Sequence, residues 1–141
     1  MQYKIPFTII DIPSRGHHII CSALLSGFKF NMLIDTGASL TAFDLGRIRQ
    51  VFQESIILPY NSTFTGIGNA TAEIFETEIK EIALGKLQIK NCKVLLVQME
   101  SINKAYAAYD LDRIDGVIGG DWLIRFGAGI DYKRQILTLE S

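Results

Sequence analysis

Residues 32–39 of the chain have the sequence MLIDTGAS, and the tripeptide DTG occurs only there in 141 residues. The preceding residues 28–34, FKFNMLI, alternate and then become wholly apolar, as a strand does when it enters a core. Gly37 lets the backbone turn sharply after such a strand, because it has no Cβ to clash. The sequence therefore predicts a carboxylate, that of Asp35, at the end of a buried strand.

A pair of such carboxylates can hydrolyse an amide bond without a metal or a covalent nucleophile. One carboxylate acts as a general base on water, and the other, protonated, acts as a general acid. Two aspartates about 3 Å apart share one proton, because like charges at that distance cannot both ionise. A chain with one Asp-Thr-Gly segment supplies one carboxylate, so this chemistry requires a second copy. The alternative interpretation of the tripeptide is an ordinary turn.

Two later segments bear on this choice. Residues 65–70, TGIGNA, form a glycine-rich tip between polar, β-prone segments, and residues 114–123, IDGVIGGDWL, place two apolar residues before Gly119. Together with residues 32–39, they occur in an order that resembles the single-domain aspartic proteases of the retropepsin type. The resemblance covers about residues 19–139, with residues 65–69 at the position of the flap tip in that family.

The resemblance implies both a fold and an activity. The fold is all-β and mainly antiparallel, a closed retropepsin-like acid-protease barrel with one or two short helices, one lobe per chain and residues 1–141 as a single domain. The activity is proteolysis by a homodimeric aspartic endopeptidase, a hydrolase that acts on a peptide or protein substrate without a cofactor or metal. The implied catalytic residues are Asp35, Thr36 and Gly37. The implied substrate-binding residues are Ala38, Ser39, Gly66, Ile67, Gly68, Val117 and Ile118.

Several alternatives remain open at this stage. A non-catalytic peptide-binding or dimerisation module could keep the same fold. Residues 65–70 could form an ordinary hairpin turn, whereas a phosphate-binding loop is disfavoured because no Walker lysine follows. Asp115 and Asp121 are candidates for a second catalytic carboxylate within the chain. However, neither begins an Asp-Thr-Gly or Asp-Ser-Gly segment, and Asp121 resembles a helix N-cap.

Composition limits the classes of partner. With 14 basic and 15 acidic residues the net charge is −1, which gives no electrostatic case for nucleic acid binding. No apolar run is long enough to span a membrane, and the N-terminal residues lack the pattern of a signal peptide. Cys21 and Cys92 fit no metal spacing and lie in apolar segments, so we expect two buried free thiols. Free thiols favour a reducing compartment, and we therefore expect a cytoplasmic protein.

The number and spacing of the histidines argue against a histidine metal site and against serine or cysteine triads. His17 and His18 are adjacent, so on a strand they would point to opposite faces and could not bind one metal together. We expect them at a surface turn. Because the chain has no other histidine, serine and cysteine triads are improbable.

Periodicity predicts the remaining elements. Strands over residues 5–12 and 19–25 flank a turn at residues 13–16, and a helix follows Asp44, with apolar residues at helical spacing up to residue 52. Residues 100–113 fit a loop or a short helix. Residues 120–126 indicate a short helix, and residues 130–139 a closing strand or hairpin.

Overall fold

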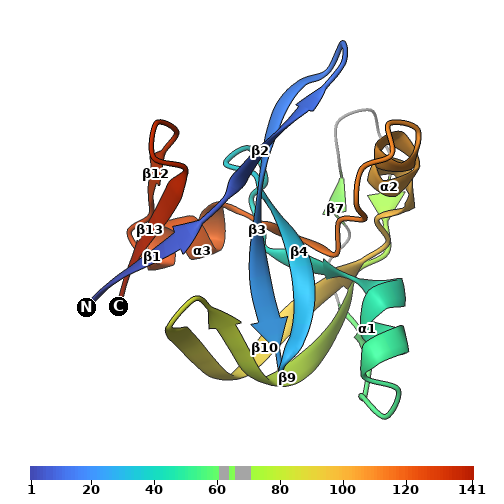
Figure 1. Ribbon diagram of the computed structural model, residues 1–141. Helices are drawn as coiled ribbons and strands as arrows, with labels where there is room; N and C mark the ends of the chain where they lie inside the picture. Colours follow the sequence, from blue (N-terminus) through green and yellow to red (C-terminus); the bar gives the residue numbers. More distant parts are fainter. Residues whose placement is uncertain (61–63, 66–70) are drawn as a thin grey trace.

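The computed structural model describes residues 1–60, 64–65 and 71–141 (Figure 1). The strands are β1 (Gln2–Pro6), β2 (Thr8–Ile12), β3 (Gly16–Leu25), β4 (Phe28–Ile34), β5 (Ala42–Asp44), β6 (Leu58–Pro59), β7 (Phe64–Thr65), β8 (Thr71–Ala72), β9 (Phe75–Leu84), β10 (Leu87–Val97), β11 (Gly116–Ile118), β12 (Gly129–Asp131) and β13 (Ile136–Glu140). The helices are α1 (Leu45–Val51), α2 (Glu100–Ala107) and α3 (Gly120–Arg125).

Six strands form a closed barrel. They are hydrogen-bonded in the order β3, β4, β11, β5, β10, β9, and β9 also pairs with β3, so the sheet closes on itself. Alternate residues of β9 and β10 point inward, as the buried Ile79, Leu87 and Ile89 show. Phe30 and Phe43 fill the middle of the barrel with no exposed surface. The predicted mainly antiparallel, closed barrel is confirmed.

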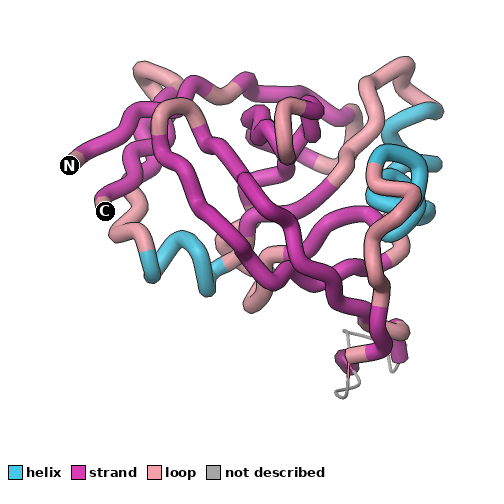
Figure 2. The backbone as a smooth tube through the Cα atoms, turned by 90° about the horizontal axis from the view of Figure 1, so that it is seen from below, coloured by secondary structure: helices cyan, strands magenta, loops and turns pink. Residues whose placement is uncertain are grey.

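A smaller sheet joins the two ends of the chain. Its strand order is β1, β13, β12, and the β1–β13 ladder runs antiparallel from Gln2 opposite Glu140 to Pro6 opposite Ile136. The termini therefore lie side by side (Figure 1). Both views place α3 near this terminal sheet, and α1 and α2 on the opposite side of the barrel (Figure 2). No helix in the described part of the chain is long and apolar enough to cross a membrane.

The helices follow local signals to different degrees. The side chain of Asp44 accepts the backbone N–H of Arg47 and so caps α1 at the predicted residue. Residues 100–113, which by sequence fit either a loop or a short helix, contain the helix α2. The described residues thus hold three short helices where the resemblance implied one or two.

Some strand boundaries differ from the prediction. Residues 5–12 belong to two strands, β1 and β2, which separate at Phe7 because β1 pairs with β13 and β2 pairs with β3. The predicted turn joins β2 to β3, with Ser14 and Gly16 at positive φ. Residues 130–139 form the hairpin of β12 and β13. The predicted flap tip, including Gly66, Ile67 and Gly68, lies outside the described residues.

Candidate active site

Strand topology fixes the position of Asp35. β11 lies between β4 and β5 and runs parallel to β4, with Ile118 beside Ile34. Because both parallel strands end at the same edge, Asp35 leaves the sheet next to Gly119. The backbone N–H of Asp35 continues the ladder by donating to the carbonyl of Ile118 at 3.0 Å.

The backbone after β11 holds the loop that follows Asp35. A Cβ on Gly119 would lie 2.7 Å from the carbonyl carbon and oxygen of Leu40 and 2.9 Å from the carbonyl oxygen of Ala38. The N–H of Gly120 donates to the carbonyl of Ala38 at 2.7 Å, and the N–H of Asp121 donates to the carbonyl of Ser39 at 3.2 Å. Only glycine fits at position 119, because a side chain there would push the loop away.

Thr41 and Asp121 form a second connection between loop and helix. The backbone N–H and the hydroxyl of Thr41 both donate to Oδ1 of Asp121, at 2.9 and 2.7 Å. The Thr41 hydroxyl in turn accepts the N–H of Gly119 at 3.0 Å. The predicted N-cap role of Asp121 is wrong, because Gly119 is the N-cap residue and Asp121 lies in the first turn of α3. Its carboxylate instead binds the loop, a role that the sequence did not indicate.

The Asp35 carboxylate is half-buried at the surface of this loop. Its Oδ1 accepts the N–H of Gly37 at 2.9 Å, while Thr36 and Gly37 are exposed. The φ angle of Gly37 is not positive. A Cβ at this position would instead lie 3.3 Å from Oδ1 of Asp35, so glycine allows its backbone to approach the carboxylate closely.

An apolar pocket opens on one side of Asp35. Its volume is about 290 Å³. The lining residues are Asp35, Ala38, Ser39, Leu40, Ala42, Ile74, Leu95, Val97, Gln98, Met99 and Val117. Of the sequence-derived substrate residues, Ala38, Ser39 and Val117 therefore meet at one pocket. Ile118 lies in the barrel core and is only 1% exposed.

A second pocket, of about 320 Å³, also borders Asp35 and is more polar. His17, His18, Thr36 and Tyr132 line it together with apolar side chains. The histidines belong to β3 and not to a turn, because residues 16–20 of β3 pair with the whole of β2. In both linings, Asp35 is the sole carboxylate among the described residues.

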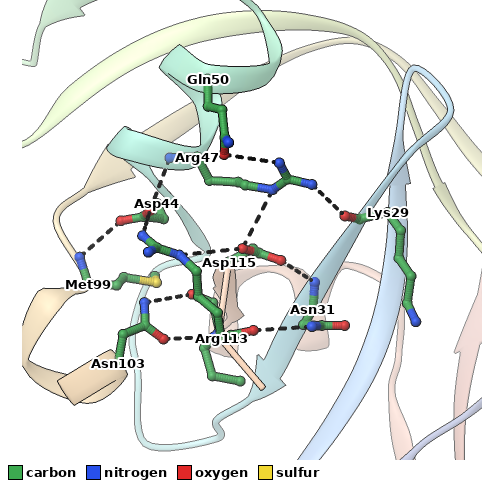
Figure 3. Close-up of polar contacts among 10 residues, drawn as sticks. Lys29, Asn31, Asp44, Arg47, Gln50, Met99, Asn103, Arg113 and Asp115 are labelled. Carbon is green, nitrogen blue, oxygen red and sulfur yellow. Dashed lines mark hydrogen bonds and ion pairs between the residues drawn. The ribbon is translucent and has the colours of Figure 1, made fainter. Parts of the chain in front are cut away.

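Asp115 and Asp44 belong to a polar network with Asn31, Arg47 and Arg113 (Figure 3). Asp115 accepts the N–H of Asn31 at 2.9 Å and lies 3.7 Å from Nε of Arg47. Burial raises the pKa of Asp115, and this rise is partly offset by the Asn31 hydrogen bond and by nearby arginines. These contacts occupy the Asp115 carboxylate, so it is not available as a partner for Asp35.

Asp44 connects this network to the apolar pocket. Its Oδ2 accepts a hydrogen bond from Nη2 of Arg113 at 2.7 Å, and its Oδ1 accepts one from the backbone N–H of Met99 at 3.1 Å (Figure 3). Asn103 adds two hydrogen bonds to the backbone of Ile114, one accepted and one donated. Since Met99 lines the pocket, Asp44 fixes one of its walls.

Other kinds of site find no support in the described part of the chain. It contains no group of three or more histidine, cysteine, aspartate or glutamate residues that could hold a metal ion. Cys21 and Cys92 are free thiols, as predicted, although Cys92 is half-buried where a buried thiol was expected.

Comparisons with known proteins identify the family and the fold. A sequence model described as aspartyl protease matches residues 22–122. No curated protein sequence matches the chain. A retropepsin-like aspartic protease from Rickettsia conorii has a similar structure, with 19% identity, a TM-score of 0.58 and coverage of 99% of this chain and 98% of that one.

Two further structures share the fold. The retroviral protease-like domain of Ddi1 from Leishmania major is 15% identical, with a TM-score of 0.58 and coverage of 86% of this chain and 87% of that one. The EIAV protease, in complex with the inhibitor HBY-793, is 20% identical, with a TM-score of 0.56 and coverage of 79% of this chain and 90% of that one. The chain belongs to the aspartyl protease family and has the retropepsin-like fold.

Proposed function

We propose that the chain is an aspartic endopeptidase that acts as a homodimer, with Asp35 of each copy activating water for hydrolysis of a peptide bond. One observation carries the proposal. Asp35 is the sole carboxylate in the described lining of two pockets, and it lies on an exposed loop. A two-carboxylate site can form there only when a second copy brings its own Asp35.

The chemistry then follows from the paired carboxylates. They share one proton, because two negative charges about 3 Å apart repel strongly. The ionised aspartate takes a proton from the bound water, which attacks the scissile carbonyl. The protonated aspartate stabilises the developing oxyanion, and proton transfer to the amine completes cleavage. The hydrogen bond from Gly37 orients the Asp35 carboxylate and, with the loop connections described above, supports its position.

The terminal sheet supports the proposed dimer. Among the described strands, β12 pairs on one side only, with β13, so its other edge is open. Ile130 of β12 lines the same pocket as Thr36, which brings this edge near the Asp35 loop. A two-fold axis through the loop would let the Thr36 side chains meet and the two β12 edges pair. The pairing of β1 with β13 within one chain means that the dimer does not need to exchange terminal strands.

The remaining parts of the site complete the proposal. The two pockets beside Asp35 would bind substrate side chains, and Ala38, Ser39 and Val117 would contact the substrate in the apolar pocket. Gly66, Ile67 and Gly68 would form the tip of a flap that excludes water from the peptide. We also propose that residues 1–141 act as one domain and that the protein is cytoplasmic, which the free thiols of Cys21 and Cys92 support.

Peptide cleavage by matched variants tests this function. The wild type, Asp35→Asn and the control Asp112→Asn are each incubated with a peptide library between about pH 4 and pH 7. Asp112 is an exposed carboxyl outside both pockets, so its loss controls for the change in net charge. We expect cleavage by the wild type and by Asp112→Asn only. Cleavage by all three would refute the role of Asp35, and cleavage by none would leave a non-catalytic binding module.

A further inference from the structure

The two pockets beside Asp35 differ in chemistry. The first is lined mainly by apolar side chains, whereas the second carries two imidazoles and the phenol of Tyr132. The family resemblance assigned no role to His17 or His18. His18 is the better placed of the two, because it is half-buried while His17 is exposed.

A buried tyrosine fixes the His18 ring. Nδ1 of His18 and the hydroxyl of Tyr106, in α2, are 2.6 Å apart, and the two ring centroids are 5.8 Å apart. Tyr106 is 1% exposed, and burial raises its pKa to about 12. The Tyr106 hydroxyl therefore keeps its proton at every pH at which the protein would work.

This hydrogen bond determines which ring nitrogen of His18 carries the proton. In the described structure the Tyr106 hydroxyl has no other hydrogen-bond partner. If Nδ1 donated, the hydroxyl hydrogen would be buried without an acceptor, which is unfavourable. In the neutral imidazole, the hydroxyl therefore donates to Nδ1 and the ring proton lies on Nε2. Nε2 makes no hydrogen bond to the described residues, so it is free to donate to a ligand in the pocket.

Charge near the pocket favours a neutral ligand group. The Asp35 carboxylate borders the pocket, and in the proposed dimer the aspartate pair carries one negative charge. His17 lies 3.7 Å from the carboxylate of Asp11, which would balance a charge on His17. The negative charge at Asp35 would repel a carboxylate on a substrate side chain in this pocket.

We propose that this pocket selects a substrate side chain with an uncharged hydrogen-bond acceptor, the amide of glutamine or asparagine, whose oxygen accepts Nε2–H of His18. The proposal rests on the proposed endopeptidase function and specifies its substrates. These carry an amide side chain near the scissile bond as well as an apolar side chain for the first pocket. His18 is then a specificity-determining residue, and Tyr106 is a positioning residue that sets its tautomer.

A substituted peptide series tests the preference. A cleaved peptide with apolar side chains receives glutamine, glutamate or leucine at each position around the scissile bond in turn. One neutral hydrogen bond predicts a kcat/KM about three- to tenfold higher for glutamine than for leucine at one position. Glutamate should be poorer than glutamine there. His18→Phe keeps a planar ring against Tyr106 but removes the donor, so it should bring the ratio of kcat/KM for the glutamine and leucine peptides to about one.

Tyr106→Phe removes only the hydroxyl and should weaken the same preference through KM, because the His18 ring then loses its fixed tautomer. The proposal is overturned if His18→Phe still cleaves the glutamine peptide with a higher kcat/KM than the leucine peptide. It is also overturned if the wild type prefers the glutamate peptide or cleaves all three peptides with the same kcat/KM. In these cases the endopeptidase function stands, because the apolar peptide is still cleaved.

If the wild type cleaves no peptide, the proposed function fails and a binding measurement decides the specificity. NMR of ¹⁵N-labelled histidine rings reports the tautomer and ligand contact without turnover. We expect His18 protonated at Nε2, with a resonance that shifts more with the glutamine peptide than with the leucine peptide. A ring protonated at Nδ1, or equal shifts with both peptides, would refute the role of His18.

Discussion

Aspartate side chains of this chain differ in function because their surroundings differ. Asp35 is half-buried on an exposed loop and accepts one backbone N–H. Asp44 and Asp115 are 3% and 5% exposed and are surrounded by hydrogen-bond donors and arginines. A buried carboxylate of this kind holds elements together, whereas the half-buried Asp35 borders two pockets and lies on an exposed loop.

The raised pKa of Asp115 predicts how stability depends on pH. The folded protein binds a proton at Asp115 more tightly than the unfolded chain does, so the contribution of this group to stability falls as pH rises above its ordinary value of 3.8 and through the raised pKa. Asp115→Asn removes this dependence. We expect the free energy of unfolding of the wild type, relative to Asp115→Asn, to be lower at pH 7 than at about pH 4.

Urea unfolding of both proteins at the two pH values, at one protein concentration, measures this difference. The prediction is wrong if the difference in unfolding free energy between the two proteins is the same at both pH values, or if the wild type is relatively more stable at pH 7. Either result would show that burial is not the main influence on the pKa of Asp115.

At the scale of elements, the Asp35 loop depends on the segment that joins β11 to α3. Gly119 approaches the loop backbone more closely than any side chain allows, and Thr41 and Asp121 connect the loop to the first turn of α3. The Asp35 loop is thus held by a segment that lies far from it in the sequence.

Two neighbouring glycines allow a matched test of this support. Gly119→Ala places a Cβ 2.7 Å from backbone atoms of Leu40, so the loop must move, and we expect a loss of about 1–3 kcal/mol in unfolding free energy together with most of the activity. Gly120→Ala places its Cβ 3.5 Å from the carbonyl oxygen of Ala38, which is an ordinary contact. It should keep both stability and activity.

Urea unfolding and cleavage of one peptide compare these two variants. Equal effects of the two substitutions would mean that the close approach of Gly119 does not hold the loop.

Local signals predicted some elements, and long-range contacts determined the others. The apolar strand before Asp35 and the cap at Asp44 depend on neighbouring residues, and both were visible in the sequence. The Thr41–Asp121 bond joins residues 80 apart and the His18–Tyr106 bond residues 88 apart. Sequence periodicity does not reveal contacts between residues so far apart. From the sequence alone, the histidines are therefore expected at a surface turn, and residues 100–113 fit either a loop or a short helix.

At the scale of the whole molecule, one chain forms a closed barrel with its own terminal sheet but brings only one carboxylate, that of Asp35, to the described lining of the two pockets. The open edge of β12 and the exposed loop at Thr36 lie on the surface that a second copy would approach in the proposed dimer. Dimerisation is therefore the step that would create the active site, and activity per chain should rise with protein concentration.

Subunit mixing tests the sharing of the site. Wild-type and Asp35→Asn chains are denatured, combined in equal amounts and refolded together at constant total concentration, so that subunits pair at random. If both Asp35 side chains are needed, about one quarter of the dimers are intact, and cleavage falls to about one quarter of the all-wild-type rate. A rate of about one half would show that each chain works with its own Asp35 alone, and it would contradict the shared site.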